Sequence, residues 1–355
     1  MKALVLEEYG HFVYRDWPTP VPGPGEVLIR VKACAVCGSD VHGMDGSTGR
    51  RRPPLIMGHE AAGVIEALGE GVTDHTVGER VTFDSTVYCG QCPACKAGLI
   101  NLCEHRQVLG VSCEEYRRHG AMAEYLTVPA YILYPLPDEV SFVQASLVEP
   151  MSVAYHGVMQ APVPTEGVAM VVGCGTIGIL AIQVLKGLGV PAVIGVDVED
   201  RRLELAKKAG ASAVINSRTE NAHERIAAVT AGKGPDVSYD MTGIAATVLQ
   251  CIEETKENGH VVFVGNLAKE VTIPLQKVIL KQLGLHGSCA SAGEYPECLK
   301  LIAEGKARAE EIVSGCFPLA EGDRWIHKVY DREDGLDKIV LIPEWPSSVT
   351  RAQRV

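Results

Sequence analysis

Four cysteines in one loop carry the strongest chemical signal of this sequence. The loop contains the run Tyr88-Cys89-Gly90-Gln91-Cys92-Pro93-Ala94-Cys95, and Cys103 follows after seven further residues. Four thiolates grouped in a turn-rich loop suit a single tetrahedral Zn²⁺, and a zinc with four protein ligands is closed and structural. The spacing therefore predicts a structural zinc site whose ligands are Cys89, Cys92, Cys95 and Cys103.

Two other roles for these thiols are a buried apolar position and a disulfide. The loop is polar and rich in turn residues, which argues against four core cysteines. The opening run Met1-Lys2-Ala3-Leu4-Val5-Leu6-Glu7-Glu8 is too short an apolar stretch for a secretory signal. We therefore expect a reducing, cytoplasmic compartment, where cysteine clusters bind metal more often than they form bridges.

A second group of metal-binding residue types lies nearer the amino terminus. Cys37 opens the run Cys37-Gly38-Ser39-Asp40-Val41-His42, and the triplet Gly58-His59-Glu60 follows. Cys, His and Glu all bind zinc, and a zinc with three protein ligands keeps a position open for water or substrate. Each residue taken alone is also compatible with a buried, hydrogen-bonded polar group, so the spacing permits a catalytic site without requiring one.

A glycine motif indicates a dinucleotide site. Gly173-Cys174-Gly175-Thr176-Ile177-Gly178 matches G-x-G-x-x-G and lies between an apolar run and a helical pattern. The first glycine permits the tight turn, the second lets the backbone approach a pyrophosphate, and the third lets helix and strand pack closely. The helix N-terminus stabilises the phosphate charge. The alternative is a strand-turn-helix with incidental glycines.

The choice between NAD and NADP rests on a carboxylate. Asp197 stands nineteen residues after Gly178, at the end of the next predicted strand. A carboxylate there accepts hydrogen bonds from the ribose hydroxyls and repels a 2′-phosphate, and Glu199 and Asp200 add negative charge. Arg202 is the counter-argument, since a nearby arginine accommodates a 2′-phosphate. The sequence favours NAD.

The positioning elements fall into two classes. The first 150 residues hold short apolar runs, among them 26–31, 61–69 and 78–83, separated by Pro and Gly turns, which predicts an antiparallel, barrel-like domain. From Gly167 onward, strands alternate with helices, which predicts a doubly wound parallel sheet. The predicted strands are 168–172, 192–196, 213–215, 236–240, 261–264 and 283–286, with helices at 176–188, 201–209 and 296–303 and a final strand at 338–342.

Length and charge limit the possible functions. The chain has 355 residues, which predicts two domains, and its formal net charge of -11 disfavours nucleic-acid and membrane partners, including a zinc-ribbon module. No apolar run approaches the roughly 20 residues of a membrane helix. The one basic run, Arg50-Arg51-Arg52, predicts an exposed loop, with contact to an anionic substrate as the alternative.

Jointly, these stretches resemble the zinc-containing medium-chain dehydrogenase/reductases, in the branch of the sorbitol (polyol), butanediol and threonine dehydrogenases. The resemblance extends to about Pro343 and also rests on Glu149-Pro150-Met151-Ser152-Val153 and Lys338-Ile339-Val340-Leu341-Ile342-Pro343. It implies a two-domain α/β protein. A β-rich, barrel-like (GroES-like) catalytic zinc-binding domain spans 1–153 and 290–355, and a doubly wound parallel-sheet Rossmann NAD-binding domain spans 154–289.

The resemblance also implies a role for each residue. Cys37, His59 and Glu60 would bind the catalytic zinc, with Glu149 bound directly or through water. Ser39 and His42 match the proton relay. The implied cofactor-binding residues are Gly173, Gly175, Thr176, Ile177, Gly178, Asp197, Arg202, Val264 and Lys338. The cofactors would be NAD and about two zinc ions per chain, one catalytic and one structural.

The implied activity is hydride transfer between a secondary alcohol or polyol and NAD, giving a ketone, in a homodimer or homotetramer. The Arg-Tyr pair of animal sorbitol dehydrogenases is absent from residues 287–293. Its absence leaves 2,3-butanediol, L-threonine or a sugar-phosphate alcohol as alternative substrates. A fold-retaining binding protein is the non-enzyme alternative, and the joint presence of the zinc-ligand and relay residues argues against it.

Overall fold

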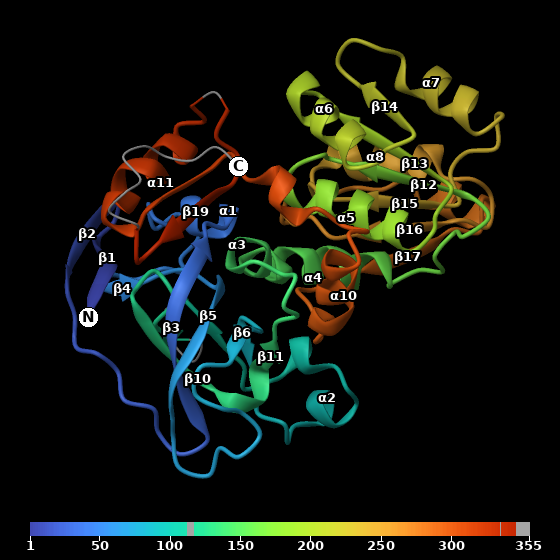
Figure 1. The fold of residues 1–355 in the computed structure, drawn as a ribbon. Helices are drawn as coiled ribbons and strands as arrows, with labels where there is room; N and C mark the ends of the chain where they lie inside the picture. Colours follow the sequence, from blue (N-terminus) through green and yellow to red (C-terminus); the bar gives the residue numbers. More distant parts are fainter. Residues whose placement is uncertain (112–116, 334, 346–355) are drawn as a thin grey trace. The chain divides into compact units, whose positions relative to one another are not determined.

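The computed structural model describes residues 1–111, 117–333 and 335–345. The chain divides into two units (Figure 1). Unit 1 comprises Met1–Glu149, Tyr295–Leu299 and the residues from Glu310 onward, whereas unit 2 comprises Pro150–Glu294 and Lys300–Ala309. The predicted ranges were 1–153 and 290–355 for one domain and 154–289 for the other, so residues 150–153, 290–294 and 300–309, predicted in the first domain, lie in unit 2. The difference arises because helices α4 (Val148–Val158) and α10 (Tyr295–Ala303) each continue from one unit into the other.

Unit 1 is built from short strands that pair mainly antiparallel. A seven-stranded sheet has the order β11-β6-β5-β3-β19-β18, with β10 also paired to β3, and two three-stranded sheets have the orders β2-β1-β4 and β7-β8-β9. The strands are β1 (Lys2–Glu8), β2 (His11–Asp16), β3 (Glu26–Ala35), β4 (Leu55–Ile56), β5 (Glu60–Leu68), β6 (Arg80–Phe83), β7 (Thr86–Val87), β8 (Gln107–Leu109), β9 (Arg117–Arg118), β10 (Tyr125–Pro129), β11 (Leu133–Pro135), β18 (Gly315–Pro318) and β19 (Ile339–Ile342).

The β3–β5 pair at the centre of this sheet has two irregularities that cancel. Between Leu28 and Ile29 the partners move from Ala67 to Ile65, which leaves one extra residue on β5. Further along, between residues 31 and 33, the extra residue is Lys32 on β3. The original register is thereby restored at the end of the pair, where residue 35 faces residue 60.

Short helices and a buried core complete unit 1. The helices are α1 (Gly38–Val41), α2 (Pro93–Lys96), α3 (Phe142–Ser146), α11 (Gly322–Tyr330) and the 3-10 turns η1 (Ile100–Leu102), η3 (Ala130–Ile132), η4 (Ala309–Ile312) and η5 (Leu319–Glu321). The sheets enclose a cluster of buried side chains that includes Leu4, Ile29, Ile65, Phe83 and Leu341. Burying each such side chain contributes about 1.5–3 kcal/mol, so this core holds the strand ends in place.

Unit 2 is a six-stranded parallel sheet flanked by helices. Its strand order is β14-β13-β12-β15-β16-β17, the doubly wound order in which the first strand lies at the centre. The strands are β12 (Val168–Val172), β13 (Ala192–Asp197), β14 (Ala213–Asn216), β15 (Val237–Asp240), β16 (His260–Phe263) and β17 (Gly284–Gly287); the helices are α5 (Thr176–Gly187), α6 (Asp200–Lys208), α7 (Ala222–Val229), α8 (Ala245–Glu254) and α9 (Leu275–Leu280). The predicted parallel sheet is confirmed.

The helices of both units are short. Within the described ranges, none is long and apolar enough to cross a membrane.

Candidate active site

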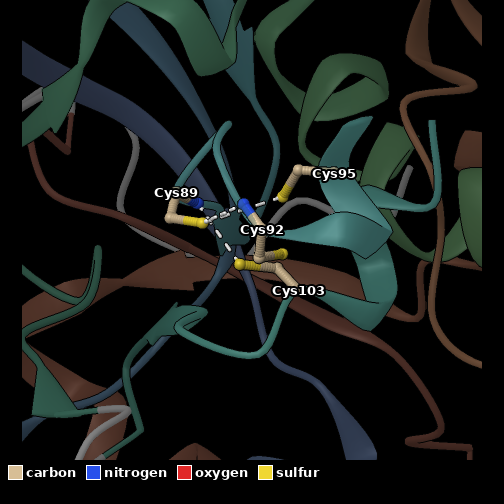
Figure 2. Close-up of side chains that lie close together, drawn as sticks. All are labelled: Cys89, Cys92, Cys95 and Cys103. Atoms are coloured by element: carbon tan, nitrogen blue, oxygen red, sulfur yellow. Dashed lines mark hydrogen bonds between the residues drawn. The ribbon is translucent and has the colours of Figure 1, made fainter. Parts of the chain in front are cut away.

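The four cysteines of the predicted structural site converge in unit 1. The Sγ atoms of Cys89, Cys92, Cys95 and Cys103 all lie within 4.8 Å of one another, and Figure 2 shows the four side chains gathered at one point. The Sγ atoms of Cys89 and Cys95 are 4.0 Å apart, and all four thiols are free. Four sulfur donors at this separation fit the tetrahedral cage of a structural zinc.

Backbone N–H groups point at these sulfurs. The amides of Gln91 and Cys92 each donate to Cys89 Sγ at 3.4 Å, and this lowers the pKa of the Cys89 thiol. Amides of Cys95 and Glu104 lower the pKa of Cys92 to about 6. Zinc binds the thiolate form, so donors that stabilise thiolates favour metal binding.

Local structure fixes the two ends of the cysteine loop. Strands β7 and β8 pair antiparallel, with Val87 opposite Gln107, and close its base. The ring of Tyr88 packs edge-on against Tyr131, whose hydroxyl donates to the Tyr88 carbonyl at 2.6 Å. Helix α2 begins at Pro93, a residue suited to the first helical position. The loop is therefore held at its base and along its length.

A second candidate metal site lies where β3 and β5 meet. Donor atoms of Cys37, His59 and Glu60 lie within 4.8 Å of one another. Strand register explains this, because Ala35 at the end of β3 faces Glu60 at the start of β5. Cys37 follows β3 by two residues and caps the N-terminus of α1. His59 and Glu60 are buried, whereas Cys37 is half-buried. The donor set fits zinc with an open position.

Lys338 lies against this second group. Its ammonium donates to Glu60 Oε2 and to the carbonyl of Val36 at 3.0 Å, and its side chain is 2% exposed. Burial acts to lower the pKa of Lys338, but the adjacent Glu60 carboxylate raises it. The sequence had associated Lys338 with the cofactor. In the structure it contacts Glu60, because β19 pairs with β3 with residue 340 opposite residue 35, and its contact with the cofactor stays a prediction.

A fully buried carboxylate, Asp40, lies behind His59. Asp40 Oδ2 is 3.6 Å from His59 Nδ1. Burial acts to lower the pKa of His59, but the Asp40 and Cys37 charges raise it to about 10 in the absence of metal. A carboxylate beside one ring nitrogen favours a proton there and frees the other nitrogen to bind metal.

Glu149 is buried in the first turn of α4. It accepts a hydrogen bond from Ser85 Oγ at 2.9 Å, and burial raises its pKa. Among the residues described, the group of donors within 4.8 Å comprises Cys37, His59 and Glu60, and Glu149 lies outside it. Its charge nevertheless interacts with His59. A carboxylate that interacts with His59 but lies outside the donor group is suited to contact a bound metal through a water molecule.

The glycine motif forms the turn between β12 and α5 in unit 2. Gly173 has a φ of +94°, and a Cβ on Gly178 would lie 1.9 Å from the Gly173 carbonyl oxygen, so both positions require glycine. A Cβ on Gly175 would have no neighbour within 4 Å. The turn is thus tight on its inner side and open at Gly175, directly before Thr176 and Ile177 in the first turn of α5. It fits a pyrophosphate approaching the helix N-terminus.

Asp197, the last residue of β13, closes the glycine turn. Its Oδ2 accepts from the Cys174 amide at 2.7 Å, and its Oδ1 accepts from the amides of Val198 and Glu199 at 2.7 and 3.0 Å. Arg202 Nε lies 3.4 Å from a Glu199 carboxylate oxygen. The arginine that was the argument for NADP is therefore engaged by a neighbouring acid.

Comparisons with known proteins agree with these geometries. Residues 23–138 match the family model for the alcohol dehydrogenase GroES-like domain, and residues 176–304 match that for zinc-binding dehydrogenases. The chain is 33% identical to a sorbitol dehydrogenase of Halalkalibacterium halodurans, over 97% of this chain and 99% of that protein. It is 32% identical to "Probable D-xylulose reductase A" of Emericella nidulans, over 91% of each chain.

The chain belongs to the zinc-containing medium-chain dehydrogenase/reductases. Among solved structures, the dehydrogenase is similar to an Escherichia coli alcohol dehydrogenase complexed with NADH, with a TM-score of 0.89, 30% identity, and coverage of 96% of this chain and 99% of that one. A zinc-binding dehydrogenase of Sinorhizobium meliloti bound to NADP has a TM-score of 0.88, 30% identity and the same coverage.

These findings confirm the predicted family, the two-domain fold of GroES-like and Rossmann parts, and the zinc-dependent oxidoreductase class with a nicotinamide cofactor. The comparisons do not distinguish NAD from NADP, because one similar structure contains NADH and the other contains NADP. The choice of NAD stays a prediction, as do the roles of individual residues.

The predicted relay residues of the dehydrogenase lie on α1 and just after it. Both Ser39 and His42 are exposed. Ser39 donates its amide to Cys37 Sγ at 3.4 Å, which ties the start of α1 to the candidate metal site. Within the described part of the chain, no hydrogen bond joins the side chains of Ser39 and His42. Val264, a predicted cofactor residue, follows β16 in unit 2 and donates its amide to the Asp240 carbonyl at 2.9 Å.

Sequence reasoning missed three polar residues that contact the site of this dehydrogenase. They are Asp40, Ser85 and the buried Arg51, which pairs with Asp40 at 2.8 Å. Asp40 was within the quoted motif, so its position between two site residues was an available signal. Arg51 was predicted to be exposed with its neighbours, and this is wrong, because Asp40 draws it into the interior.

Proposed function

We propose that this dehydrogenase oxidises a secondary alcohol or polyol to a ketone with NAD, using Zn²⁺ held by Cys37, His59 and Glu60. The observation that carries the proposal is the convergence of these three donors within 4.8 Å at the end of the β3–β5 pair. When bound, zinc supplies Lewis acidity toward the substrate oxygen, and the nicotinamide takes the hydride.

Ser39 and His42 would move the proton. Ser39 accepts the proton of the substrate hydroxyl and releases its own toward His42, which passes it to solvent. Both residues are exposed, and the sulfur-bound amide of Ser39 supports its position beside the metal ligands. Since no direct bond joins the two side chains in the described residues, we expect a water molecule between them.

Lys338 and Glu149 are charged residues that would orient a metal ligand and contact the metal through water, respectively. Lys338 orients Glu60 by a buried ion pair, a role we propose beside the predicted cofactor contact. Glu149, held by Ser85 at 2.9 Å, would contact the metal through water. Lys338, Glu60 and Glu149 are all nine-tenths or more buried, so each charge has a large effect on its neighbours.

The cofactor would bind at the glycine turn of unit 2. Gly173, Gly175 and Gly178 shape the turn, and Thr176 and Ile177 begin the helix that receives the pyrophosphate. Asp197 would accept from the ribose hydroxyls. The ion pair that occupies Arg202 supports NAD, because it leaves the negative charge of Asp197 beside the ribose. The four cysteines would hold a second, structural zinc.

A neutral polyol is the substrate class that we favour. Of the three arginines at 50–52, Arg51 is buried and neutralised by Asp40, which weakens the case for an anionic substrate at this loop. The names of the two similar proteins, a sorbitol dehydrogenase and a D-xylulose reductase, support the same class. 2,3-Butanediol, L-threonine and sugar-phosphate alcohols are the alternatives that the substrate assay distinguishes.

We also expect a homodimer or homotetramer in the cytoplasm. Helix α9 exposes three apolar side chains, Leu275, Ile279 and Leu280, at 62%, 67% and 76%, which is consistent with a partner surface. Four reduced thiols arranged for zinc suit a reducing compartment. Light scattering checks the first expectation, and a monomer would contradict it.

The test is a substrate panel with metal analysis. Secondary alcohols, polyols, inositols and their phosphates are assayed with NAD and with NADP, following absorbance of the reduced cofactor. We expect turnover of neutral polyols, about two zinc ions per chain, and loss of turnover in Cys37→Ser with the fold retained. Full activity in Cys37→Ser would refute the zinc role, and zinc-loaded protein without turnover on any compound would favour a binding protein.

A further inference from the structure

Arg51 is a buried arginine that the proposed function does not use. It lies between α1 and β4, and its side chain is 3% exposed, whereas Arg50 and Arg52 are exposed. Its Nη2 donates to Asp40 Oδ1 at 2.8 Å and to Ser39 Oγ at 3.2 Å. A guanidinium is rarely buried, and only when it has defined partners. The burial of Arg51 against Asp40 and Ser39 therefore needs an explanation.

We propose that Arg51 is a positioning residue of the proton relay, which fixes the Ser39 hydroxyl on one side and, through Asp40, the His59 ring on the other. The proposal rests on the proposed function, in which Ser39 accepts the substrate proton and His59 binds zinc. Arg51 becomes a further functional residue, and its position explains the direction in which the proton leaves the site.

The turn after α1 is shaped to receive this side chain. A Cβ placed on Gly43 would lie 2.8 Å from Arg51 Cγ and 3.4 Å from Thr48 Oγ1. Gly43 is itself buried, so the space is closed to solvent. The same Cβ would lie 2.8 Å from the Ser39 carbonyl oxygen, so both the backbone of α1 and the stem of Arg51 require glycine at residue 43.

The hydrogen-bond chemistry of arginine sets the direction of proton transfer. A guanidinium has only donors and stays protonated, so Ser39 Oγ must be the acceptor in this bond. Ser39 keeps its own proton and one lone pair for the substrate and for the next relay member. Because Arg51 lies on the buried side and Ser39 is exposed, the proton cannot leave inward and must leave toward solvent.

The charge of Arg51 also acts on the serine oxygen. As Ser39 releases its proton, negative charge develops on Oγ, and a fixed positive charge 3.2 Å away stabilises it. The effect is larger than at a surface site because the guanidinium is shielded from water. Arg51 therefore fixes the Ser39 hydroxyl and favours the release of its proton toward the next relay member, without exchanging a proton itself.

The same guanidinium restrains the carboxylate behind His59. Asp40 is fully buried, its Oδ1 bonds Arg51, and its Oδ2 is 3.6 Å from His59 Nδ1. Neither Asp40 Oδ2 nor His59 Nδ1 has a hydrogen-bond partner among the described residues, and the 3.6 Å between them is longer than a hydrogen bond. Arg51 therefore holds Asp40 in the orientation that presents Oδ2 to the His59 ring.

The experiment compares Arg51→Met and Arg51→Lys with a matched control, Arg118→Met. Arg118 also pairs with a carboxylate in unit 1, Glu26 at 2.5 Å, away from the proposed site. The zinc-loaded full chain is assayed with NAD and the polyol that the natural protein oxidises fastest. The measured quantities are kcat, KM, the solvent deuterium isotope effect on kcat, Tm and the visible spectrum of cobalt-substituted protein.

We expect Arg51→Met to lower kcat by about 100-fold with KM nearly unchanged, to raise the solvent isotope effect and to shift the cobalt spectrum. Arg51→Lys keeps the ion pair with Asp40, so it should retain Tm and recover about tenfold of the lost kcat. Arg118→Met should lower Tm and leave kcat, isotope effect and spectrum unchanged.

Two results would overturn the proposal. One is a loss of activity in Arg51→Met that is fully accounted for by a lower zinc content, with an unchanged isotope effect. A purely structural residue would behave in this way. The other is an Arg51→Lys protein with wild-type kinetics and spectrum, which carries the test if Arg51→Met does not fold. Zinc-loaded natural protein without turnover would refute the proposed function instead, and the cobalt spectrum would still test the Asp40–His59 contact.

Discussion

The buried ion pair of Lys338 and Glu60 predicts a large loss of stability when the lysine charge is removed, because both side chains are shielded from water. The two side chains are 2% and 1% exposed, and the lysine ammonium also donates to the Val36 carbonyl. Lys338→Met keeps a chain of similar length but removes the charge. The Glu60 carboxylate is then left inside the protein without its ion-pair partner.

The expected loss of stability is large. Removing one partner of a buried ion pair costs about 3–5 kcal/mol, because the remaining charge is desolvated and unpaired. A whole domain is stable by only about 5–15 kcal/mol, so the change is readily measured. Adding Glu60→Gln to Lys338→Met removes the stranded charge, and the double variant should recover at least half of the loss.

Tryptophan fluorescence during urea unfolding suits this measurement. The chain has three tryptophans, Trp17, Trp325 and Trp345, and all belong to unit 1, so the signal reports the unit that holds the pair. A zinc ion at the second group would also compensate the Glu60 charge. The loss should therefore be largest in protein treated with a weak chelator that leaves the four-cysteine site loaded.

Either of two outcomes would refute this role of the buried charge pair. One is a loss below about 1 kcal/mol in Lys338→Met, the value typical of an exposed pair. The other is a double variant as unstable as the single one, which would show that the lost stability comes from packing and not from the stranded charge.

Three further predictions concern the other sites. Cys95→Ser should lower zinc content from about two ions to about one per chain and lower Tm by roughly 10 °C, since structural zinc contributes folding free energy; unchanged calorimetric Tm would contradict this. Asp197→Ser should raise the ratio of kcat/KM for NADP over NAD by about fivefold, because a repulsion of order 1 kcal/mol is removed; an unchanged ratio would show that the carboxylate does not select the cofactor. Burial and the neighbouring His260 lower the pKa of His286, so the folded protein resists protonation there. Stability should be unaffected above about pH 6.5 and should fall as pH drops below it, less steeply in His286→Gln than in the natural protein by calorimetric Tm; equal slopes would exclude His286 as the source.

Elements whose signal is local were predictable from the sequence. The run 168–172 is apolar throughout because its strand is covered on both faces, and β12 has those bounds. The glycine motif was equally readable, since its turn depends on residues within six positions. The position of Asp197 followed from its place at the end of a strand, although the three amides that donate hydrogen bonds to it are visible only in the structure.

Features that depend on distant strand pairing were not predictable. Lys338 meets Glu60 because β19 pairs with β3, across more than 270 residues of sequence. Periodicity shows that residues 338–342 form a strand but not which strand lies beside it. Likewise, the sequence shows Arg51 only as one of three consecutive arginines. Its burial depends on the contact with Asp40 and on the space beside Gly43, which only the structure shows.

The paired irregularities of β3 and β5 make one part of this chain unsuitable for piecewise engineering. Each strand carries one extra, unpaired residue, Lys32 on β3 and Glu66 on β5. A deletion of Lys32 alone would remove one irregularity and keep the other, which would change the bend and twist of the strand pair that leads to Cys37 and His59. Grafts between relatives should therefore exchange β3 and β5 together, whereas the surface loops elsewhere can differ in length without changing the distance between the metal ligands.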